Sequence, residues 1–393
     1  MKKKPTSVRI GIVAGEVSGD VLGAGLIREL KKRLPDVQFV GIGGPRMQRD
    51  GCTSWYPMDA LTVMGFEAFE RLPQILRIRR ELAQRLRAEP PDLFIGIDAP
   101  DFNLGLEQKL RAGGIRTVHY VSPTVWAWRR WRIHKIRRAV DHMLALFPFE
   151  ERYYQEQGVP VTFVGHPLAD VIPLRYDQAA VRRELGLPLE RPIVALLPGS
   201  RMSELRRHAD LFVQTAQWLH RRYPALHFVA PFASEQTKAV FEQALTRRAA
   251  TGLPITVQPF RSREAMGAAD IVLCASGTAT LEAALLGKPM VVTYRISPLT
   301  AWLVRPMLHV RLYSLPNNLA GRELVPELIQ DDATPEKLGQ AVARLWVNTK
   351  EAGAMRRALA AIHKSLRRNA NVRAAQAVIA LLPAGSRRRR KAA

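Results

Sequence analysis

The chain has 393 residues, too many for one ordinary hydrophobic core, which predicts two domains. Hydrophobic residues make up 47% and charged residues 24%, as in folded globular proteins. The sequence contains no charge-free apolar window of about 18 residues, so we predict no membrane-spanning helix. A formal net charge of +24 predicts a polyanionic partner, which could be nucleic acid, an anionic membrane surface or a phosphorylated substrate. The two cysteines indicate a reducing, cytoplasmic compartment and exclude a disulfide framework.

Apolar runs of β type alternate with amphipathic helical patterns along most of the chain. A first set of runs covers residues 8–15, 37–44, 92–98, 117–122, 142–147 and 161–165, and a second set covers 192–199, 226–231, 255–260, 270–276 and 289–294. Nearly continuous apolar strands flanked by helices are typical of parallel sheets covered on both faces. The predicted fold class is therefore α/β, with two Rossmann-like parallel-sheet domains.

The segment 166–192 carries several prolines and no strand pattern, so we place the domain boundary there. This gives an N-terminal domain over residues 1–170 and a C-terminal domain over 171–365. Three helical patterns close the chain, at 335–347, 351–367 and 371–382. We expect residues 366–385 to return to the N-terminal domain and 386–393 to form a basic tail.

Ligands in open α/β sheets bind beyond the carboxyl ends of the strands, so the residues after each run are candidates for a site. The first run leads into a turn containing Ser18, Gly19 and Asp20. This turn lacks the G-x-G-x-x-G pattern of dinucleotide-binding proteins. Taken alone, it is better explained as a glycine turn with a Ser or Asp helix cap than as a binding site.

A carboxylate, Asp98, ends the third run, and Asp101 and Asn103 follow it. A partly desolvated carboxylate at a strand end has a raised pKa and can act as a general base. The alternative is that Asp101 or Asn103 caps the next helix. We therefore predict Asp98 as the base, although sequence spacing does not separate it from Asp101.

Two strand ends in the second half place small polar residues at the start of a helix. After 192–199 stand Ser200 and Arg201, which suit a pyrophosphate because a helix N-terminus carries roughly +0.5 charge and arginine adds a full one. After 270–276 come hydroxyl groups and an acid that could accept two hydrogen bonds from a ribose, namely Ser276, Gly277, Thr278, Thr280 and Glu282. The alternative is a helix that Ser276 and Thr278 cap and in which Glu282 completes a capping box.

Two asparagines, Asn317 and Asn318, lie in a predicted loop. Neutral amides suit sugar hydroxyls or the edge of a uracil, and the alternative is a simple turn signal. The chain has no D-x-D, P-loop, H-E-x-x-H or G-x-S-x-G motif. We therefore expect no metal and no cofactor.

Residues 63–86 combine apolar and arginine side chains as an interfacial membrane helix does. An ordinary helix packed on the sheet explains the pattern equally well, and 297–313 is a second membrane candidate. A basic, tryptophan-containing run at 119–138 suits an anionic surface, an active-site loop or a helix with solvated arginines. The predicted membrane contacts of the first segment are Phe66, Phe69, Leu72, Ile75 and Leu76.

Several motifs in this order resemble those of the lipid-A-disaccharide synthase family, which is glycosyltransferase family 19. The similarity is collinear over roughly residues 8–380. It rests on "AGEVSGDVLGAGLI", "GIGGPRM", "IGIDAPDFNL", "YVSPTVWAWRRWRIHKI", "VGHPL", "LLPGSRMSE", "ASGTATLEAALLGKPMVVTYR" and "PNNLAGRELVPELIQ". Each motif alone is weak, and their combination is specific.

The resemblance implies a GT-B fold, with the two domains facing a central cleft, and an inverting, metal-independent glycosyltransferase. The donor would be UDP-2,3-diacylglucosamine and the acceptor 2,3-diacylglucosamine 1-phosphate (lipid X), giving lipid A disaccharide 1-phosphate and UDP. The enzyme would be cytoplasmic and bound peripherally to the inner membrane of a Gram-negative bacterium, and a homodimer is compatible with the family. Nucleic acid would not be a partner.

The same resemblance gives the candidate residues roles. Asp98 would deprotonate the acceptor hydroxyl, Arg201 would stabilise the departing UDP, and Glu282 would bind the ribose. Asn317 and Asn318 would contact the uracil, sugar or phosphate. The alternative function is another GT-B enzyme that uses a UDP-sugar, such as a lipid-linked cell-wall N-acetylglucosaminyltransferase or a UDP-sugar 2-epimerase.

Overall fold

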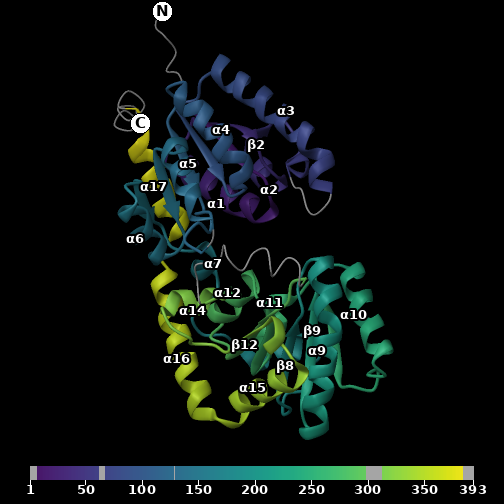
Figure 1. The fold of residues 1–393 in the computed structure, drawn as a ribbon. Coiled ribbons are helices and arrows are strands. Elements are labelled where there is room, and N and C mark those ends of the chain that lie inside the picture. The colour runs from purple at the N-terminus through teal and green to yellow at the C-terminus, as the bar shows by residue number, and fades with distance from the viewer. Residues whose placement is uncertain (1–6, 62–66, 128, 298–311, 384–393) are drawn as a thin grey trace, which may run out of the picture. The chain divides into compact units, whose positions relative to one another are not determined.

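The computed structural model describes residues 7–61, 67–127, 129–297 and 312–383. These residues form two compact units (Figure 1). The first unit consists of the residues up to Asp170 and those from Leu366 onward, and the second unit is Val171–Ser365. Each unit is built on one parallel sheet, as the alternating apolar and amphipathic patterns predict.

The first unit contains a seven-stranded parallel sheet in the order β3-β2-β1-β4-β5-β6-β7. The strands are β1 (Arg9–Ala14), β2 (Gln38–Ile42), β3 (Cys52–Ser54), β4 (Leu93–Ile97), β5 (Thr117–Tyr120), β6 (His142–Ala145) and β7 (Val161–Phe163). The helices are α1 (Val17–Arg33), α2 (Pro45–Arg49), α3 (Glu67–Ala88), α4 (Pro100–Ala112), α5 (Ile133–Ala139), α6 (Pro148–Glu156), α7 (Pro167–Val171) and α17 (Ala370–Leu381). Two short 3-10 turns, η1 (Met58–Ala60) and η2 (Arg130–Arg132), lie between them.

The last described helix, α17, packs on α1 in the first unit (Figure 1). Ala374, Ala375 and Val378 of α17 share one buried apolar cluster with Leu26 of α1. The small side chains of α17 allow the two helices to approach closely, and burial of this apolar face holds the returning chain in place. The expected return of a C-terminal helix to the N-terminal domain is confirmed.

The second unit contains a six-stranded parallel sheet in the order β10-β9-β8-β11-β12-β13. Its strands are β8 (Ile193–Leu197), β9 (His227–Phe232), β10 (Ile255–Pro259), β11 (Ile271–Ala275), β12 (Met290–Tyr294) and β13 (Glu327–Ile329). Its helices are α8 (Gln178–Glu184), α9 (Met202–Arg222), α10 (Glu235–Arg247), α11 (Ser262–Ala268), α12 (Thr278–Leu285), α14 (Leu315–Ala320), α15 (Pro335–Val347) and α16 (Thr349–Leu366), with a 3-10 turn η4 (Gln330–Asp332).

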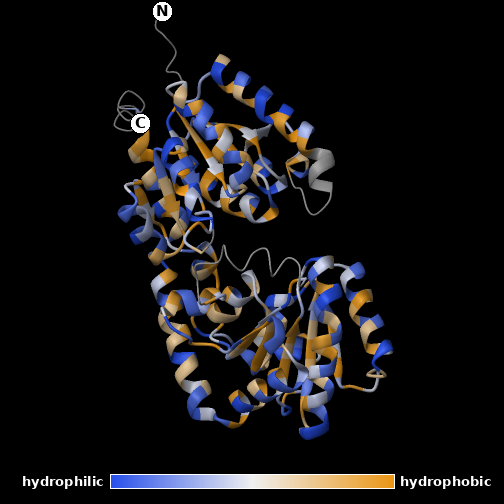
Figure 2. Ribbon diagram, in the orientation of Figure 1, coloured by the Kyte–Doolittle hydropathy of each residue, from blue (hydrophilic) through white to orange (hydrophobic). Residues whose placement is uncertain are grey.

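The strands of both sheets are the most apolar part of each unit, and the outer faces of the helices are polar (Figure 2). All five residues of β4, β8 and β11 are buried, which explains why these runs show no polar alternation. The edge strands β3 and β13 were not predicted from the sequence. Each has three residues, too few to produce a recognisable apolar run.

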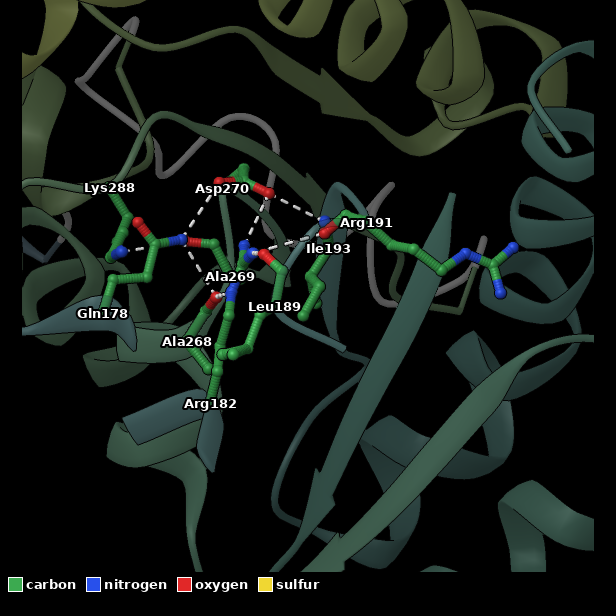
Figure 3. A network of polar contacts seen from close by, with 9 residues as sticks. All are labelled: Gln178, Arg182, Leu189, Arg191, Ile193, Ala268, Ala269, Asp270 and Lys288. Carbon is green, nitrogen blue, oxygen red and sulfur yellow. Dashed lines mark hydrogen bonds and ion pairs between the residues drawn. The ribbon is translucent and has the colours of Figure 1, made fainter. Parts of the chain in front are cut away.

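A polar network fixes α8 to the amino-terminal ends of β8 and β11 (Figure 3). Arg182 of α8 is 7% exposed and donates to Asp270 at 2.8 Å and to the carbonyls of Ala268 and Leu189. The same Asp270 carboxylate accepts from the amide of Ile193. Because α8 belongs to the proline-containing segment between the two sheets, this network anchors that segment to the second unit.

Arg182→Met is expected to destabilise the second unit by about 2–3 kcal/mol. It would leave the Asp270 carboxylate without its cationic partner and the carbonyls of Leu189 and Arg191 without the Arg182 donor, in a mostly buried place. The prediction is checked by urea unfolding, with Arg183→Met as the matched control because Arg183 is exposed on the same helix. Equal unfolding free energies for the two variants would contradict it.

Candidate active site

A cavity of about 550 Å³ lies at the carboxyl ends of the parallel strands of the second unit. It is lined by residues that follow four strands: Gly199, Ser200 and Arg201 after β8, Ala233 after β9, Phe260 after β10, and Ser276, Gly277 and Thr278 after β11. Glu204 and Glu282 add carboxylates to the same wall. The structure therefore brings together six predicted residues that are up to 82 positions apart, namely Ser200, Arg201, Ser276, Gly277, Thr278 and Glu282.

Two helices begin at this cavity, and no side chain caps either of them. Arg201 is the N-cap residue of α9 and Gly277 that of α12, and neither N-cap residue makes a side-chain capping hydrogen bond. The alternative of a Ser276 or Thr278 cap is therefore wrong, and Glu282 lies beyond the capping-box position. Two positive helix ends face one cavity, which is an arrangement suited to a diphosphate.

The turn before α9 requires glycine. Gly199 has a φ of +130°, and a Cβ atom there would lie 2.8 Å from Cβ of Glu204. A larger residue would displace the helix start from the cavity, because both the backbone conformation and the space exclude a side chain. The motif "LLPGSR" thus has a structural reason in addition to its charge.

The two charged candidates in the cavity are available to a ligand. The Arg201 side chain is 57% exposed, and its nearest carboxylate is Glu204 at 3.9 Å. Glu282 is 23% exposed and lies 3.4 Å from Arg263 of α11. Weak pairs of this kind leave most of the hydrogen-bonding capacity of both groups for a ligand.

Phe260 is a cavity residue that the sequence reading missed. It is 70% exposed and has a φ of +57°, an unusual backbone conformation for a bulky residue. Its amide donates to the carbonyl of Phe232 at 2.8 Å. The sequence pattern predicts it as the last residue of the apolar run 255–260, although its position after Pro259 is a signal that the strand has ended.

Two predicted ligand-binding residues of this unit are buried, which corrects their assignment. Thr280 is 0% exposed and donates to the carbonyl of Gly277 at 2.7 Å. Asn317 is 0% exposed, and its amide group bonds to the backbone of Leu324 and Val325. Both side chains hold the backbone instead of facing the cavity.

Asn318 is partly exposed, and its Nδ2 donates to the carbonyl of Ser314 at 2.8 Å. It lies with Asn317 in α14, so the expectation of a loop at these two residues is also wrong.

The turn after β1 is a helix start with a structural acid. Ser18 is exposed in the first turn of α1, and Gly19 is buried against the end of β4. Asp20 is 3% exposed, and its two oxygens accept from the amides of Arg46 and Met47 at 3.0 and 2.9 Å. The assignment of Asp20 as a substrate ligand is therefore corrected, because this carboxylate holds the start of α2.

Asp98 stands in a strained turn at the carboxyl end of β4. Asp98 has a φ of +52° and the following Ala99 a φ of +43°. The pair costs on the order of 1–3 kcal/mol per residue, and such strain is typical of functional sites. The Asp98 amide donates to the carbonyl of Tyr120, and Gly15 makes room for the turn, because a Cβ on Gly15 would lie 2.7 Å from that of Ala99.

The two candidate bases differ in their surroundings. Within the described residues, the Asp98 carboxylate accepts one hydrogen bond, from the adjacent Ala99 amide at 2.9 Å. The Asp101 side chain is 79% exposed, lies in the first turn of α4 and forms an ion pair with Arg132. The Asp101 carboxylate is thus engaged by a cation, whereas the Asp98 carboxylate keeps most of its hydrogen-bonding capacity for a ligand hydroxyl.

Asn103 is not a helix cap. It is fully buried, and its Nδ2 donates to the carbonyls of Asp98 at 2.8 Å and Ile97 at 3.2 Å. These hydrogen bonds stabilise the strained turn at Asp98 and Ala99. Asparagine is a poor residue for a buried helix position, which is the signal that could have shown this role.

A buried acid–imidazole pair, Glu107 and His119, lies one helical turn beyond Asn103 and was not predicted. Their side chains are 2.8 Å apart and 0% exposed. Burial raises the pKa of Glu107 above its usual range. A side chain on Gly96 would overlap Glu107, so the glycine in β4 is what lets this helix face approach the sheet.

The helix α3 has one buried and one exposed apolar surface. Ile78, Leu82 and Leu86 are buried against α4, whereas Leu72 is 47% and Leu76 39% exposed. Of the other predicted membrane contacts, Ile75 is partly buried. Phe66 and most of 297–313 lie outside the described residues, and the side chain of Phe69 is not described. No helix among the described residues is long and apolar enough to cross a membrane.

Comparisons with known proteins show what the sequence and the fold of this chain are similar to. The chain is 54% identical over 379 residues to the lipid-A-disaccharide synthase of Pseudomonas syringae pv. syringae, covering 96% of this chain and 98% of that one. The fold is similar to UDP-GlcNAc 2-epimerase from Neisseria meningitidis (TM-score 0.64, 11% identity, 95% and 99% covered) and to a glycosyltransferase from Rickettsia africae (TM-score 0.60, 12% identity, 97% and 100% covered).

These structural likenesses support the GT-B fold class. The family model described as lipid-A-disaccharide synthetase matches residues 10–380, almost the whole described chain. Because both the family model and a relative of more than 50% identity span the chain, it belongs to the lipid-A-disaccharide synthase family.

Proposed function

We infer that the chain transfers 2,3-diacylglucosamine from its UDP derivative to 2,3-diacylglucosamine 1-phosphate, releasing UDP and forming the β-1,6-linked disaccharide 1-phosphate. Family membership supports the reaction class. The observation that carries the site is the cavity at which two uncapped helix N-termini and Arg201 meet. The Neisseria epimerase of similar fold was solved with UDP-GlcNAc bound, which supports a sugar nucleotide here.

The proposed donor site follows from the charges in the cavity. The diphosphate lies against the starts of α9 and α12, where Arg201 and backbone amides neutralise it without a metal. Glu282 accepts from the ribose hydroxyls. The exposed ring of Phe260 offers a face on which the uracil stacks. Ser200, Ser276 and Thr278 supply further hydrogen bonds.

The proposed chemistry is a single displacement. The acceptor 6-hydroxyl gives its proton to Asp98 while its oxygen forms a bond to the anomeric carbon of the donor. The bond from that carbon to the UDP oxygen breaks, and UDP takes the electron pair. Charge therefore develops on the diphosphate, where Arg201 and the helix N-termini stabilise it. Attack from the opposite face inverts the anomeric configuration.

An acceptor comparison tests this function. Purified protein with UDP-2,3-diacylglucosamine is expected to release UDP with lipid X and not with an undecaprenyl-linked acceptor. The product mass should equal that of the disaccharide 1-phosphate. UDP release with the undecaprenyl-linked acceptor alone would favour a cell-wall transferase, and formation of a free epimerised sugar would favour an epimerase.

We propose that the protein binds peripherally to the cytoplasmic face of the inner membrane through the exposed side of α3. Leu72 and Leu76 project apolar surface, and a polybasic protein gains about 1 kcal/mol per Lys or Arg close to an anionic leaflet. Both proposed substrates carry acyl chains that lie in the bilayer, so an enzyme bound to the membrane surface would reach them there.

Leu72→Ser combined with Leu76→Ser is expected to weaken binding to vesicles containing anionic lipid at least 10-fold, because each buried leucine contributes about 1.5–3 kcal/mol. Flotation of the full chain measures this. Leu189→Ser is the matched control, since Leu189 is 45% exposed in the second unit. Unchanged flotation of the double variant would rule out this membrane contact.

A further inference from the structure

Three cationic side chains from three elements gather around the first turn of α4. Arg79 of α3 donates to the carbonyl of Asp101 at 3.4 Å, and Arg132 of η2 pairs with the Asp101 carboxylate. Lys135 of α5 lies close enough to interact electrostatically with all three residues. Both α3 and α5 pack against α4, so the cluster is a product of the tertiary structure and not of one charged run.

The guanidinium of Arg79 packs against the backbone of Gly105 in α4. A Cβ on Gly105 would lie 2.5 Å from Nη1 of Arg79, so the glycine leaves the space that the guanidinium occupies. Nε of Arg79 is buried and has no hydrogen-bond partner among the described residues. A buried donor without a partner costs on the order of 1–3 kcal/mol, so the fold holds this guanidinium beside α4 at an energetic cost.

The cluster carries more positive charge than its surroundings balance. Among the described residues, Asp101 is the exposed carboxylate that contacts the cluster. Burial raises the pKa of nearby Glu107, which favours its neutral form. Burial lowers the pKa of Lys135, and the proximity of Arg79 and Arg132 lowers it further, while Asp101 acts against this shift. Three cations against one carboxylate leave a local charge of about +2, which matches the −1.5 to −2 of a phosphate monoester.

The position of the cluster relates it to the proposed base. Three trans peptide links separate Asp98 from Asp101, so their Cα atoms lie within about 11 Å. The start of α4, a 13-residue helix, adds its positive end to the same place. An acceptor sugar with its reacting hydroxyl at Asp98 would carry its phosphate on the same ring, within reach of these cations.

We propose that Arg79, Arg132 and Lys135 bind the phosphate of the acceptor and so align its hydroxyl with Asp98. This inference rests on the proposed function, because it takes the acceptor to be a sugar 1-phosphate. The site recognises a phosphate monoester, a chemistry that an anionic lipid headgroup shares. The test therefore separates the two sources.

The test compares acceptors with and without the 1-phosphate in neutral detergent micelles. For the unaltered chain, kcat/KM is expected to fall about 100-fold without the phosphate. Lys135→Gln should lower kcat/KM about 10-fold or more on the phosphorylated acceptor and change it little on the other, because a hydrogen bond to a charged group is lost only when the phosphate is present. Arg132→Gln should act in the same way.

Arg137→Gln is the matched control, because Arg137 is exposed on the same short helix two positions along and faces away from Lys135. UDP affinity should be unchanged in all variants. If Lys135→Gln lowers kcat/KM by the same factor on both acceptors, the inference is wrong. If it retains full phosphate discrimination and instead loses flotation with anionic vesicles, the cluster binds lipid headgroups, which also overturns it. Failure of the unaltered chain to use either acceptor would instead overturn the proposed function.

Discussion

Asp98→Asn is expected to lower kcat about 10²–10⁴-fold while UDP affinity stays unchanged, since general-base catalysis contributes a factor of this size. Asparagine has nearly the same shape and keeps an oxygen that can accept from the Ala99 amide, so the strained turn should persist. The loss should appear in kcat and not in donor binding, because Asp98 lies in the first unit and the donor cavity in the second. Steady-state kinetics with lipid X and calorimetry with UDP measure the two quantities.

Asp101→Asn is the control for that experiment. Asp101 precedes Asn103 in the same helix turn and already has a cationic partner, so its loss should cost much less in kcat than that of Asp98. Near-normal turnover of Asp98→Asn would end its assignment as the base. A larger loss in Asp101→Asn would transfer that role to Asp101.

The second large effect is expected at Arg201. Arg201→Gln should lower kcat about 10²–10³-fold, by analogy with the loss of one preorganised donor to a developing oxyanion. The guanidinium is 57% exposed and has only a 3.9 Å pair with Glu204, so its removal should not destabilise the fold. The expected reason for the loss is that charge on UDP increases in the transition state, when a full positive charge has the greatest effect.

A lysine at position 201 should restore part of the rate, because it keeps the charge but loses the planar pair of donors. Arg206→Gln is the control, since Arg206 is an exposed arginine on the same helix. Rates of UDP release at saturating donor, with equal melting temperatures for all variants, check the prediction. A loss confined to KM would mean that Arg201 binds ground state and transition state equally well.

Local patterns alone were sufficient to predict most of the architecture. The predicted helix at 335–347 is α15 residue for residue, and those at 351–367 and 371–382 differ from α16 and α17 by one or two residues. Fully buried parallel strands make continuous apolar runs, and caps and amphipathic faces repeat within a few residues, so these elements are visible in sequence. The two missed strands, β3 and β13, are three-residue edge strands held by their neighbours.

The residue at which each helix begins decides which polar side chains face the cavity. In α12 the N-cap is Gly277, one residue away from the predicted hydroxyl caps, and each residue along a helix turns the side chain by about 100°. This places Thr278 and Glu282 on the cavity side and buries Thr280. The same reasoning applies to Asn317 and Asn318, adjacent in sequence and different in exposure because α14 forms there.

The sequence by itself determined the two parallel sheets, the strand ends that are candidates for ligand binding, and the charged candidates Asp98, Arg201 and Glu282 at or near those ends. These features follow from local periodicity and from the rule that parallel strands present their carboxyl ends together. Only the tertiary structure decided that Asp20 supports α2, that Phe260 faces the donor cavity, and that Arg79, Arg132 and Lys135 surround Asp101. Such contacts join residues tens of positions apart, and no local pattern encodes their distance.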